Sequence, residues 1–185
     1  YNKDKGHALT RAGYVTYAAA PVGGKPPRAA LRIAGSLVSS ALSQFISRDR
    51  AMAMVRVGDG EIAVISQYCH NDKEAIDPEL QRAVEFCQAK SIPLIIGADS
   101  NAWSPLWGPD QNERGEKFEE FIGKNNLHVL NDGKKPTYYH KPNNGKTKTY
   151  IDITLINNFA YNKNMGGEWM VNDEETLSDL SLIHI

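Results

Sequence analysis

Residues 93–108, PLIIGADSNAWSPLWG, constrain the fold more than any other part of the chain. They open with a short apolar run rich in branched side chains and bounded by Gly97, a pattern typical of a buried strand. Asp99, Ser100 and Asn101 come at the carboxyl end of this run, and a turn-rich loop follows. A strand that ends in a carboxylate and an amide side chain, followed by a loop, can present both side chains to a ligand. Because Asp and Asn are also common turn formers, a purely structural role stays open from this stretch alone.

Length and charge set the broad class of the protein. With 185 residues, 41% of them hydrophobic, the chain can bury one sizeable core, so we expect a single domain over residues 1–185. The chain opens on Tyr1 and closes on what reads as a strand, which predicts a fragment of a longer polyprotein. A formal net charge of −1 does not by itself indicate a nucleic-acid-binding protein, so any basic surface that binds nucleic acid must be local.

The cysteines and histidines argue against several kinds of site. Cys69 and Cys87 are the only cysteines, and their separation argues against a disulfide framework or a structural zinc site and fits a reducing compartment. The five histidines show no metal-ligand spacing. No apolar run is long enough to span a membrane, and the first residues carry no secretory pattern, so we expect no membrane partner.

Capping residues and apolar spacing predict two helices. Asp77 is a favourable N-cap and Pro78 a favourable first residue, so a helix is expected from there to near Lys90. A second helix is expected over residues 113–125, where aromatic and aliphatic side chains recur at helical spacing.

The remaining pattern predicts about seven or eight short strands. Asp59 and Gly60 predict the turn of a β-hairpin between strands over residues 52–57 and 62–68. Residues 36–47 are ambiguous between helix and strand. Further strands are expected over residues 29–34, 127–130, 137–140, 146–156, 170–171 and 180–185. Since several strands follow one another without a helix between them, we predict an α+β fold, a sandwich of two mostly antiparallel sheets with helices outside.

Three acids stand at strand ends or beside turns, and they are the candidate catalytic groups. They are Asp99, Asp152 and Asp179. Asp152 lies between two isoleucines in a strand pattern, so it points to the face opposite both, and it needs a partner, a metal or water there. A solvated face explains it without any function. If the three acids instead converge with Asn101, their oxygens suit Mg²⁺, which could polarise a phosphoryl oxygen or activate water.

A basic and aromatic segment over residues 134–150 is the candidate nucleic-acid surface. It contains Lys134, Lys135, Lys141, Lys146 and Lys148, with Tyr138, Tyr139, His140 and Tyr150 among them. Lysines fit phosphates, and aromatic side chains fit bases or sugars. The alternative is an exposed hairpin in which lysines protect an edge strand.

A set of short motifs in a fixed order resembles the DNase I-like endonuclease/exonuclease/phosphatase family, and within it the endonuclease domain of LINE-type (non-LTR) retrotransposons. The motifs are Pro27-Arg-Ala-Ala-Leu31, Val64-Ile-Ser-Gln-Tyr68, Gly97-Ala-Asp-Ser-Asn101, Ser104-Pro-Leu-Trp-Gly108, Arg114-Gly115, Val129-Leu-Asn131, Pro136-Thr137, Tyr150-Ile-Asp-Ile-Thr154 and Ser178-Asp179. The resemblance runs from about residue 27 to the end. It implies a four-layer αββα sandwich, incomplete at its N-terminus.

The resemblance also implies roles for individual residues. Asp99 would activate the attacking water, Asn101 would contact the phosphate or metal, and Tyr68 would contact the scissile phosphate. Asp179 would bind the metal together with Asp99 and Asn101, and Asp152 would orient a histidine. The family's DNA-contacting hairpin corresponds here to Thr137, Tyr138, Tyr139, Lys141, Lys146 and Lys148.

The implied reaction is hydrolysis of one strand of double-stranded DNA with Mg²⁺, or Mn²⁺ in its place. The nick would expose a 3′-hydroxyl that primes reverse transcription. The resemblance further implies fusion to a reverse transcriptase and a nuclear location.

Three positions depart from the family pattern. Leu180 stands where the family has the histidine that stabilises charge at the phosphoryl centre, and leucine can neither donate a hydrogen bond nor carry charge. Residues 11–14 stand where Gln-Glu-Pro-Tyr is expected, so the metal-binding glutamate is absent, and Asn2 is a weak candidate for the family's first asparagine. Trp103 occupies a position where these endonucleases often carry histidine.

The departures leave two functions open. One is an endonuclease with impaired activity, and the other is a catalytically degenerate DNA-binding domain that keeps the fold and the basic hairpin. A phosphatase acting on small phosphoesters is disfavoured by the Ser-Pro-Leu-Trp-Gly loop and by the lysine-tyrosine hairpin.

Overall fold

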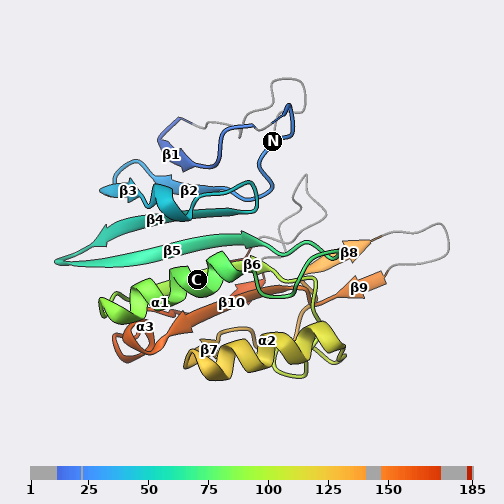
Figure 1. Cartoon of the computed structure of the whole chain (residues 1–185). Helices are drawn as coiled ribbons and strands as arrows, with labels where there is room; N and C mark the ends of the chain where they lie inside the picture. The colour runs from blue at the N-terminus through green and yellow to red at the C-terminus, as the bar shows by residue number, and fades with distance from the viewer. Residues whose placement is uncertain (1–11, 22, 141–146, 172–182, 185) are drawn as a thin grey trace.

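A six-stranded sheet forms the centre of the molecule (Figure 1). The computed structural model describes residues 12–21, 23–140, 147–171 and 183–184. Across the sheet the strands are β3 (Ser39–Ala41), β4 (Arg50–Val57), β5 (Gly60–Tyr68), β6 (Leu94–Asp99), β10 (Asp152–Asn157) and β7 (Leu127–Val129). Only β5 and β6 pair in parallel, and helix α1 (Pro78–Ala89) makes the crossover between them. The other pairs in this sheet are antiparallel.

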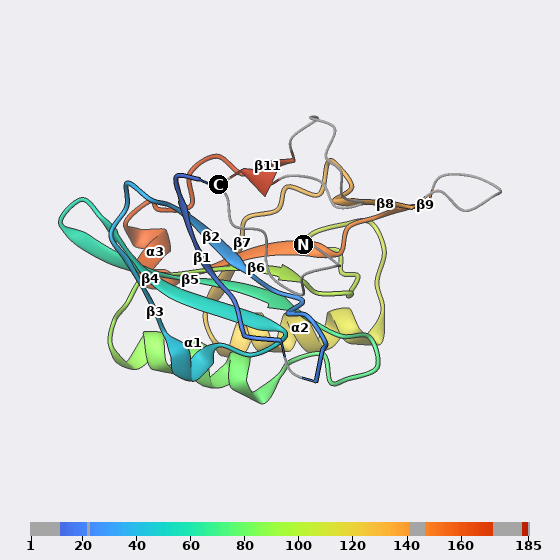
Figure 2. The same cartoon turned by 90° about the horizontal axis from the view of Figure 1, so that it is seen from above.

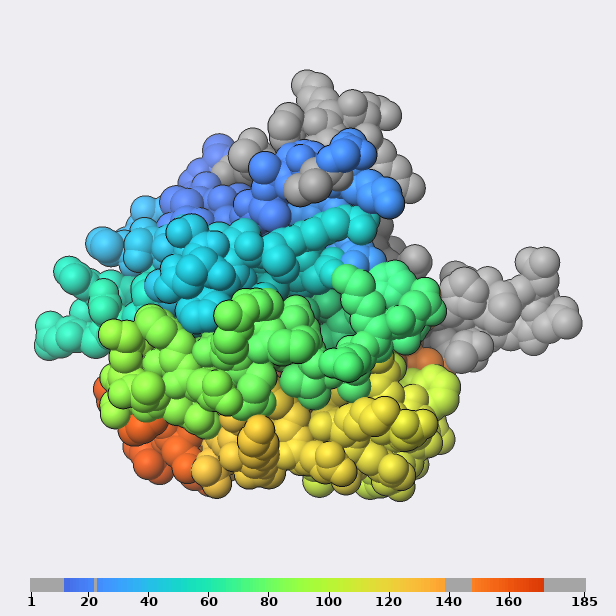
Figure 3. All heavy atoms as spheres, viewed as in Figure 1, coloured from blue at the N-terminus to red at the C-terminus, as the bar shows by residue number. Residues whose placement is uncertain are grey.

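Two helices cover one face of this sheet. At the start of α1 the Asp77 side chain accepts a hydrogen bond from the Glu79 backbone N–H (2.9 Å), so the predicted cap is confirmed. Helix α2 (Glu113–Lys124) begins after Asn112, whose side chain accepts from the Gly115 N–H (2.8 Å). Both helices bury apolar side chains in one cluster with β5, β6 and β10. They form a continuous surface on this side (Figure 3).

A smaller layer lies over the opposite face. Strands β1 (Tyr14–Tyr17) and β2 (Leu31–Ala34) pair antiparallel and cross above β4 and β5 (Figure 2). Ile33 packs there with Val55 and Ile62. Two further pairs are β8 (Tyr138–His140) with β9 (Thr147–Thr149) and β11 (Met170–Val171) with β12 (Ile183–His184). The predicted α+β sandwich of mostly antiparallel sheets is thereby confirmed, although the described residues place no helix over the outer side of β1 and β2.

The turn of the long hairpin lies one residue earlier than predicted. Val57 pairs with Gly60, so the two loop residues are Gly58 and Asp59. Gly58 has φ +58°, a conformation that glycine adopts without strain and that two-residue hairpin turns require at their first position. The preference for glycine at the first turn position, met by Gly58, therefore decides the turn, rather than the Asp59-Gly60 pair.

The segment predicted as one strand over residues 146–156 is two strands in two different sheets. β9 belongs to the small hairpin, whereas β10 enters the main sheet between β6 and β7. The break falls at Tyr150 and Ile151, where the Ile151 carbonyl accepts from the Ser100 N–H (2.8 Å). The ambiguous segment 36–47 forms β3 and a short 3₁₀ helix, Ser43–Phe45. Helix α3 (Asn158–Asn162) follows β10 and was not predicted.

In the ranges that the structure describes, no helix is long and apolar enough to cross a membrane.

Candidate active site

Asp99 and Asp152 are direct neighbours on adjacent strands. The antiparallel register pairs them residue to residue, at the end of β6 and the start of β10. Side chains at such opposed positions have Cβ atoms about 4.5–5.5 Å apart. Both point away from the helices, because their neighbours Ala98 and Ile153 pack in the helix-side cluster. Two of the three predicted acids thus converge, and the solvated face considered for Asp152 is wrong, since its exposure is only 8%.

Burial raises the pKa of both carboxyls toward neutral pH. Desolvation raises the pKa of Asp99 from 3.8 to about 6, although the Asn101 backbone N–H and the positive charge of Arg114 lower it. Desolvation, and then the charge of Asp99, raise the pKa of Asp152 to about 7, against a lowering hydrogen bond from Thr137. Asp99 Oδ1 and Asp152 Oδ2 are buried without a hydrogen-bond partner among the described residues. Such a pair of oxygens is available to a proton, a cation or another donor.

Polar side chains of the loop before β8 hold Asp152 in place. The Asp152 N–H donates to Thr137 Oγ1 (3.0 Å), and Thr137 is fully buried. Asn131 donates to the Asp152 carbonyl (2.9 Å) and accepts from the Thr154 N–H (2.8 Å). Thr137 was predicted to contact DNA from the hairpin, whereas its place in the structure is beneath the candidate site as a support of Asp152.

Tyr68 ends β5 beside Asp99 and is held by a charged pair. The parallel register pairs Tyr68 with Asp99, so both side chains share one face. The Arg28 guanidinium lies 4.7 Å from the Tyr68 ring centroid, and it donates from Nε and Nη2 to the two carboxylate oxygens of Asp49, each at 2.5 Å. His70 meets the Tyr68 ring edge-on at 6.1 Å. The Asp49 hydrogen bond raises the pKa of Arg28, so the cation over the ring is permanent.

Asn101 and Arg114 tie the loop after β6 to the loop after β5. Asn101 has φ +48°, a strained conformation for a residue with a side chain, and its amide donates to the Cys69 carbonyl (3.0 Å). Arg114 donates from Nε to the Ser100 carbonyl (3.0 Å) and from Nη1 to the Lys73 carbonyl (2.8 Å). These bonds hold the loop that carries Asp99 in one position.

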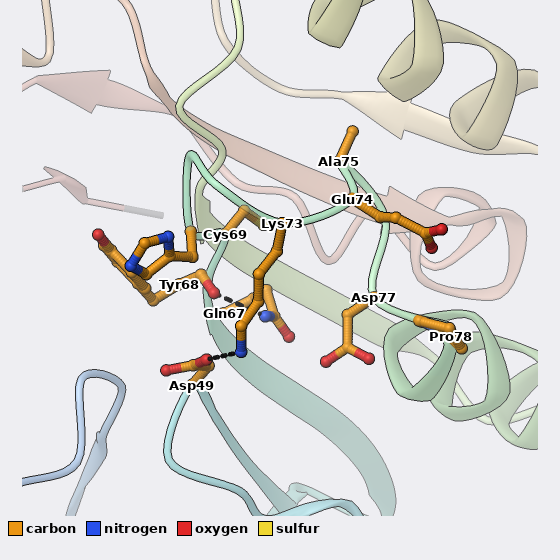
Figure 4. Close-up of a pocket in the computed structure, with 10 residues that line it drawn as sticks. Asp49, Gln67, Tyr68, Cys69, Lys73, Glu74, Ala75, Asp77 and Pro78 are labelled. Atoms are coloured by element: carbon orange, nitrogen blue, oxygen red, sulfur yellow. Dashed lines mark hydrogen bonds and ion pairs between the residues drawn. The ribbon is translucent and has the colours of Figure 1, made fainter. Parts of the chain in front are cut away.

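Two clefts meet at Tyr68. The acid cleft, about 530 Å³, lies between segment 28–32 and strands β5, β6 and β10, and both acids line it together with Arg28, Arg32 and Tyr68. The second cleft, about 360 Å³, lies on the other side of Tyr68 beside the start of α1. Lys73 reaches across its mouth to Asp49 (3.4 Å; Figure 4). The acid cleft therefore combines carboxylates on one wall with cationic side chains on the other.

The other predicted site residues lie apart from the clefts or outside the described residues. Lys148 is exposed on β9, Tyr138 is half-buried on β8, and Tyr139 lies on β8. Asp179, Leu180, Lys141 and Lys146 lie outside the described residues, so their roles stay predictions.

The sequence reasoning missed Arg28, Asp49 and Arg114 as parts of the site. Arg28 and Asp49 are 21 residues apart, and no local pattern joins them. Arg28 stands in the motif Pro27-Arg-Ala-Ala-Leu31 and Arg114 in the Arg-Gly pair that opens α2, and these two motifs were the available signals.

The acid pair suits a hard cation. Mg²⁺ prefers oxygen ligands and keeps several waters, so one or two carboxylates with vacant oxygens can hold it. Asp99 Oδ1 and Asp152 Oδ2 meet that requirement. No cluster of three or more His, Cys, Asp or Glu occurs within the described ranges, so a cation here would depend on water or substrate oxygens as well.

The fold defines the class of protein first. The endonuclease domain of TRAS1, a telomere-specific non-LTR retrotransposon, matches this chain with a TM-score of 0.80. The match covers 94% of this chain and 79% of that chain at 22% identity, so it shows the fold alone. The molecule is therefore a sandwich with the fold of that endonuclease domain.

The sequence then gives the family. The family model Exo_endo_phos_2, described as endonuclease-reverse transcriptase, matches residues 62–184, more than half of the chain. The chain belongs to this family, and in fold it resembles the endonuclease domain of a non-LTR retrotransposon.

Two curated relatives come from type-1 retrotransposable elements. The 115 kDa protein in element R1DM of Drosophila melanogaster is 29% identical over 76% of this chain, and the Pol polyprotein from element R1 of Bradysia coprophila is 32% identical over 66%. The chain spans only 14% and 12% of the lengths of these proteins.

Proposed function

We propose that this chain is a Mg²⁺-dependent DNA endonuclease domain that nicks one strand of duplex DNA with reduced activity. The single observation that carries the proposal is the opposed pair of Asp99 and Asp152. Asp152 is buried and Asp99 half-buried, and each has one buried oxygen without a hydrogen-bond partner among the described residues. Both line a cleft that also holds Arg28 and Tyr68. A phosphodiester is an anion, so a cleft with cationic and acidic walls can bind it and activate water against it.

The reaction would be hydrolysis of a P–O3′ bond. A water oxygen attacks phosphorus while Asp99 accepts the proton of the water, and the departing 3′-oxygen takes up a proton to become a 3′-hydroxyl. A pKa near 6 suits Asp99 to act as a base near neutral pH. Tyr68 is well placed to contact the phosphate, because Arg28 and His70 hold its ring beside Asp99.

Mg²⁺, with Mn²⁺ as a substitute, would be held by Asp99, Asn101 and Asp179, and Asp152 Oδ2 offers a further oxygen. The ion would supply positive charge against the phosphoryl oxygens. Asp152 would otherwise orient a histidine at position 180, where this chain has leucine.

In the full-length protein the nick would prime reverse transcription. The names of the relatives support this, since one is a Pol polyprotein of a retrotransposable element and the matching family is described as endonuclease-reverse transcriptase. Fusion to a reverse transcriptase and a nuclear location belong to the same proposal. The lysines and tyrosines of residues 134–150 would contact the DNA groove.

The second candidate is a catalytically degenerate DNA-binding domain with the same fold. Two observations favour it over full activity. Leu180 cannot supply the charge of the family's histidine, and β1 with its described flanks, residues 12–21, contains no acidic side chain to bind a metal.

Nicking of supercoiled plasmid with Mg²⁺ separates the two. We expect slow nicking that falls at least about 100-fold in Asp99→Ala, as for loss of a general base. Asp59→Ala is the matched control, because Asp59 is exposed at the tip of the β4–β5 hairpin. DNA binding with no nicking in the unaltered chain would identify the degenerate domain, and neither binding nor nicking would refute both candidates.

A further inference from the structure

Trp103 is a large apolar side chain that the loop between β6 and α2 leaves in solvent. Its exposure is 42%, whereas Trp107, four residues later, is 1% exposed. The same loop therefore buries one indole in the core and presents the other. Neither cleft includes Trp103 in its lining, so its free face lies outside both of them.

The backbone of Trp103 is fixed to the start of α2. Its N–H donates to Asn112 Oδ1, and the Asn112 N–H donates back to its carbonyl, both at 3.1 Å. The same Asn112 oxygen caps the helix through Gly115. At Gly115 there is no room for a side chain, because a Cβ atom would overlap the Trp103 carbonyl oxygen. The backbone that carries the indole is thus attached to the N-terminus of α2 and is not part of a free loop.

The rest of the loop is equally well supported. The Ser104 hydroxyl donates to Glu119 on α2 (2.6 Å), and the Ser104 carbonyl accepts from the N–H groups of Trp107 and Gly108. The Trp107 indole N–H donates to the Ala102 carbonyl (3.2 Å), and its ring packs edge-on against Phe118 at 6.3 Å. A rigid loop loses little conformational entropy on binding, so an exposed aromatic on it can bind with little ordering cost.

The position of Trp103 relates it to the acid cleft. Its Cα lies two residues from Asn101 and four from Asp99, which limits the separations to about 8 Å and about 15 Å. Nucleotides along a DNA strand advance about 3.4 Å each along the helix axis. The indole is therefore within a few nucleotides of any phosphate bound at Asp99, and a ligand that reaches both must extend beyond the cleft.

We propose that Trp103 is a stacking platform for a nucleobase of the bound DNA strand, a few nucleotides from the phosphate at the acid cleft. This inference rests on the proposed function, because it takes DNA as the ligand of the cleft. The flat face of an unpaired or flipped-out base matches an exposed indole on a fixed backbone, and such stacking tolerates any base. Trp103 thus adds affinity and positions the strand without reading its sequence.

Tryptophan fluorescence tests the platform directly. The experiment titrates the Asp99→Ala chain, which we expect to bind DNA without cleaving it, with a short single-stranded oligonucleotide and with the corresponding duplex. We expect DNA to quench the fluorescence, and Trp103→Leu to remove most of the quenching. Trp103→Leu is also expected to weaken binding by about 5- to 150-fold, the range of one base–aromatic stack, and Trp103→Phe is expected to restore part of the affinity.

Tyr161→Leu is the matched control. Tyr161 is 56% exposed on α3, after the far end of β10, where it stacks on His128 at 4.1 Å. Its loss is expected to leave DNA affinity unchanged. Far-ultraviolet circular dichroism checks that each variant is folded.

The possible results separate a failure of Trp103 stacking from a failure of the proposed DNA endonuclease function. If Trp103→Leu binds DNA as tightly as its parent, with equal quenching, the platform is refuted while the proposed function stands. If saturating DNA leaves Trp103 as accessible to acrylamide as before, the exposed indole serves another partner, such as protein, and the platform is again refuted. If the parent chain binds no DNA at all, the proposed function itself fails, and the platform fails with it.

Discussion

Replacing Asp152 by asparagine is expected to stabilise the metal-free chain above neutral pH and to lose that effect in acid. Burial and the neighbouring Asp99 raise the pKa of Asp152 from 3.8 to about 7. At pH 8 the folded chain therefore carries an ionised carboxylate in a site that disfavours it. Asparagine has the same shape and no charge, so it removes this cost.

The sign and size follow from proton linkage. Between pH 3.8 and about 7 the folded chain holds a proton on Asp152 that the unfolded chain has released, so stability falls as pH rises through this window. The slope is about 1.4 kcal/mol per pH unit for one proton. The full shift corresponds to a ceiling of about 4 kcal/mol at pH 8, and we expect about 1–3 kcal/mol because water entering the open cleft screens the charge.

Urea denaturation with EDTA at pH 4.5, 6 and 8 measures the effect. Asp152→Asn should become progressively more stable than its parent as pH rises, from no more than about 1 kcal/mol at the lowest pH. Asp59→Asn, at the exposed hairpin tip, should show no such trend. An equal difference at all three pH values, or a loss of stability at pH 8, would refute the account of a strained carboxylate pair.

Three further predictions concern the supports of the site. Gly115→Ala should destabilise the chain by about 1–3 kcal/mol in thermal denaturation, because the added methyl group overlaps the Trp103 carbonyl oxygen. An unchanged melting midpoint would contradict this close packing of the loop against α2. Burial raises the pKa of the Cys69 and Cys87 thiols to about 12, so the folded chain should react with a thiol reagent at pH 8 far more slowly than the urea-unfolded chain, and equal rates would contradict their burial. Arg28→Gln should cost about 1–2 kcal/mol in urea denaturation by breaking a two-point ion pair, whereas Arg56→Gln, from an exposed pair at 4.0 Å, should cost less than about 0.5 kcal/mol; equal losses would refute the special role of the first pair.

Helices α1 and α2 could be predicted from sequence because their signals are local, whereas the short α3 was not predicted. Asp77 and Pro78 define the start of α1 through one side chain and one fixed dihedral angle, and the structure reproduces that cap. The strand before Asp99 was predicted for the same reason, from a short apolar run between Pro93 and Gly97. Local chemistry does not decide between competing turns, and Gly58 moved the hairpin turn by one residue.

The site itself depended on register and could be predicted only in part. That Asp99 and Asp152 are both functional candidates followed from their places at strand ends. Their direct opposition follows from the pairing of β6 with β10, which joins residues more than 50 positions apart and leaves no local trace. Thr137 shows the same limit, because only the three-dimensional structure places it under Asp152 rather than on the hairpin surface.

The most direct test of the central claim is plasmid nicking in Mg²⁺ by the unaltered chain, by Asp99→Ala and by Leu180→His. The account predicts slow nicking by the unaltered chain, a loss in Asp99→Ala, and a gain of at least about tenfold in Leu180→His, because histidine restores the missing charge at the phosphoryl centre. Nicking that survives in Asp99→Ala, or no nicking by any of the three, would contradict it.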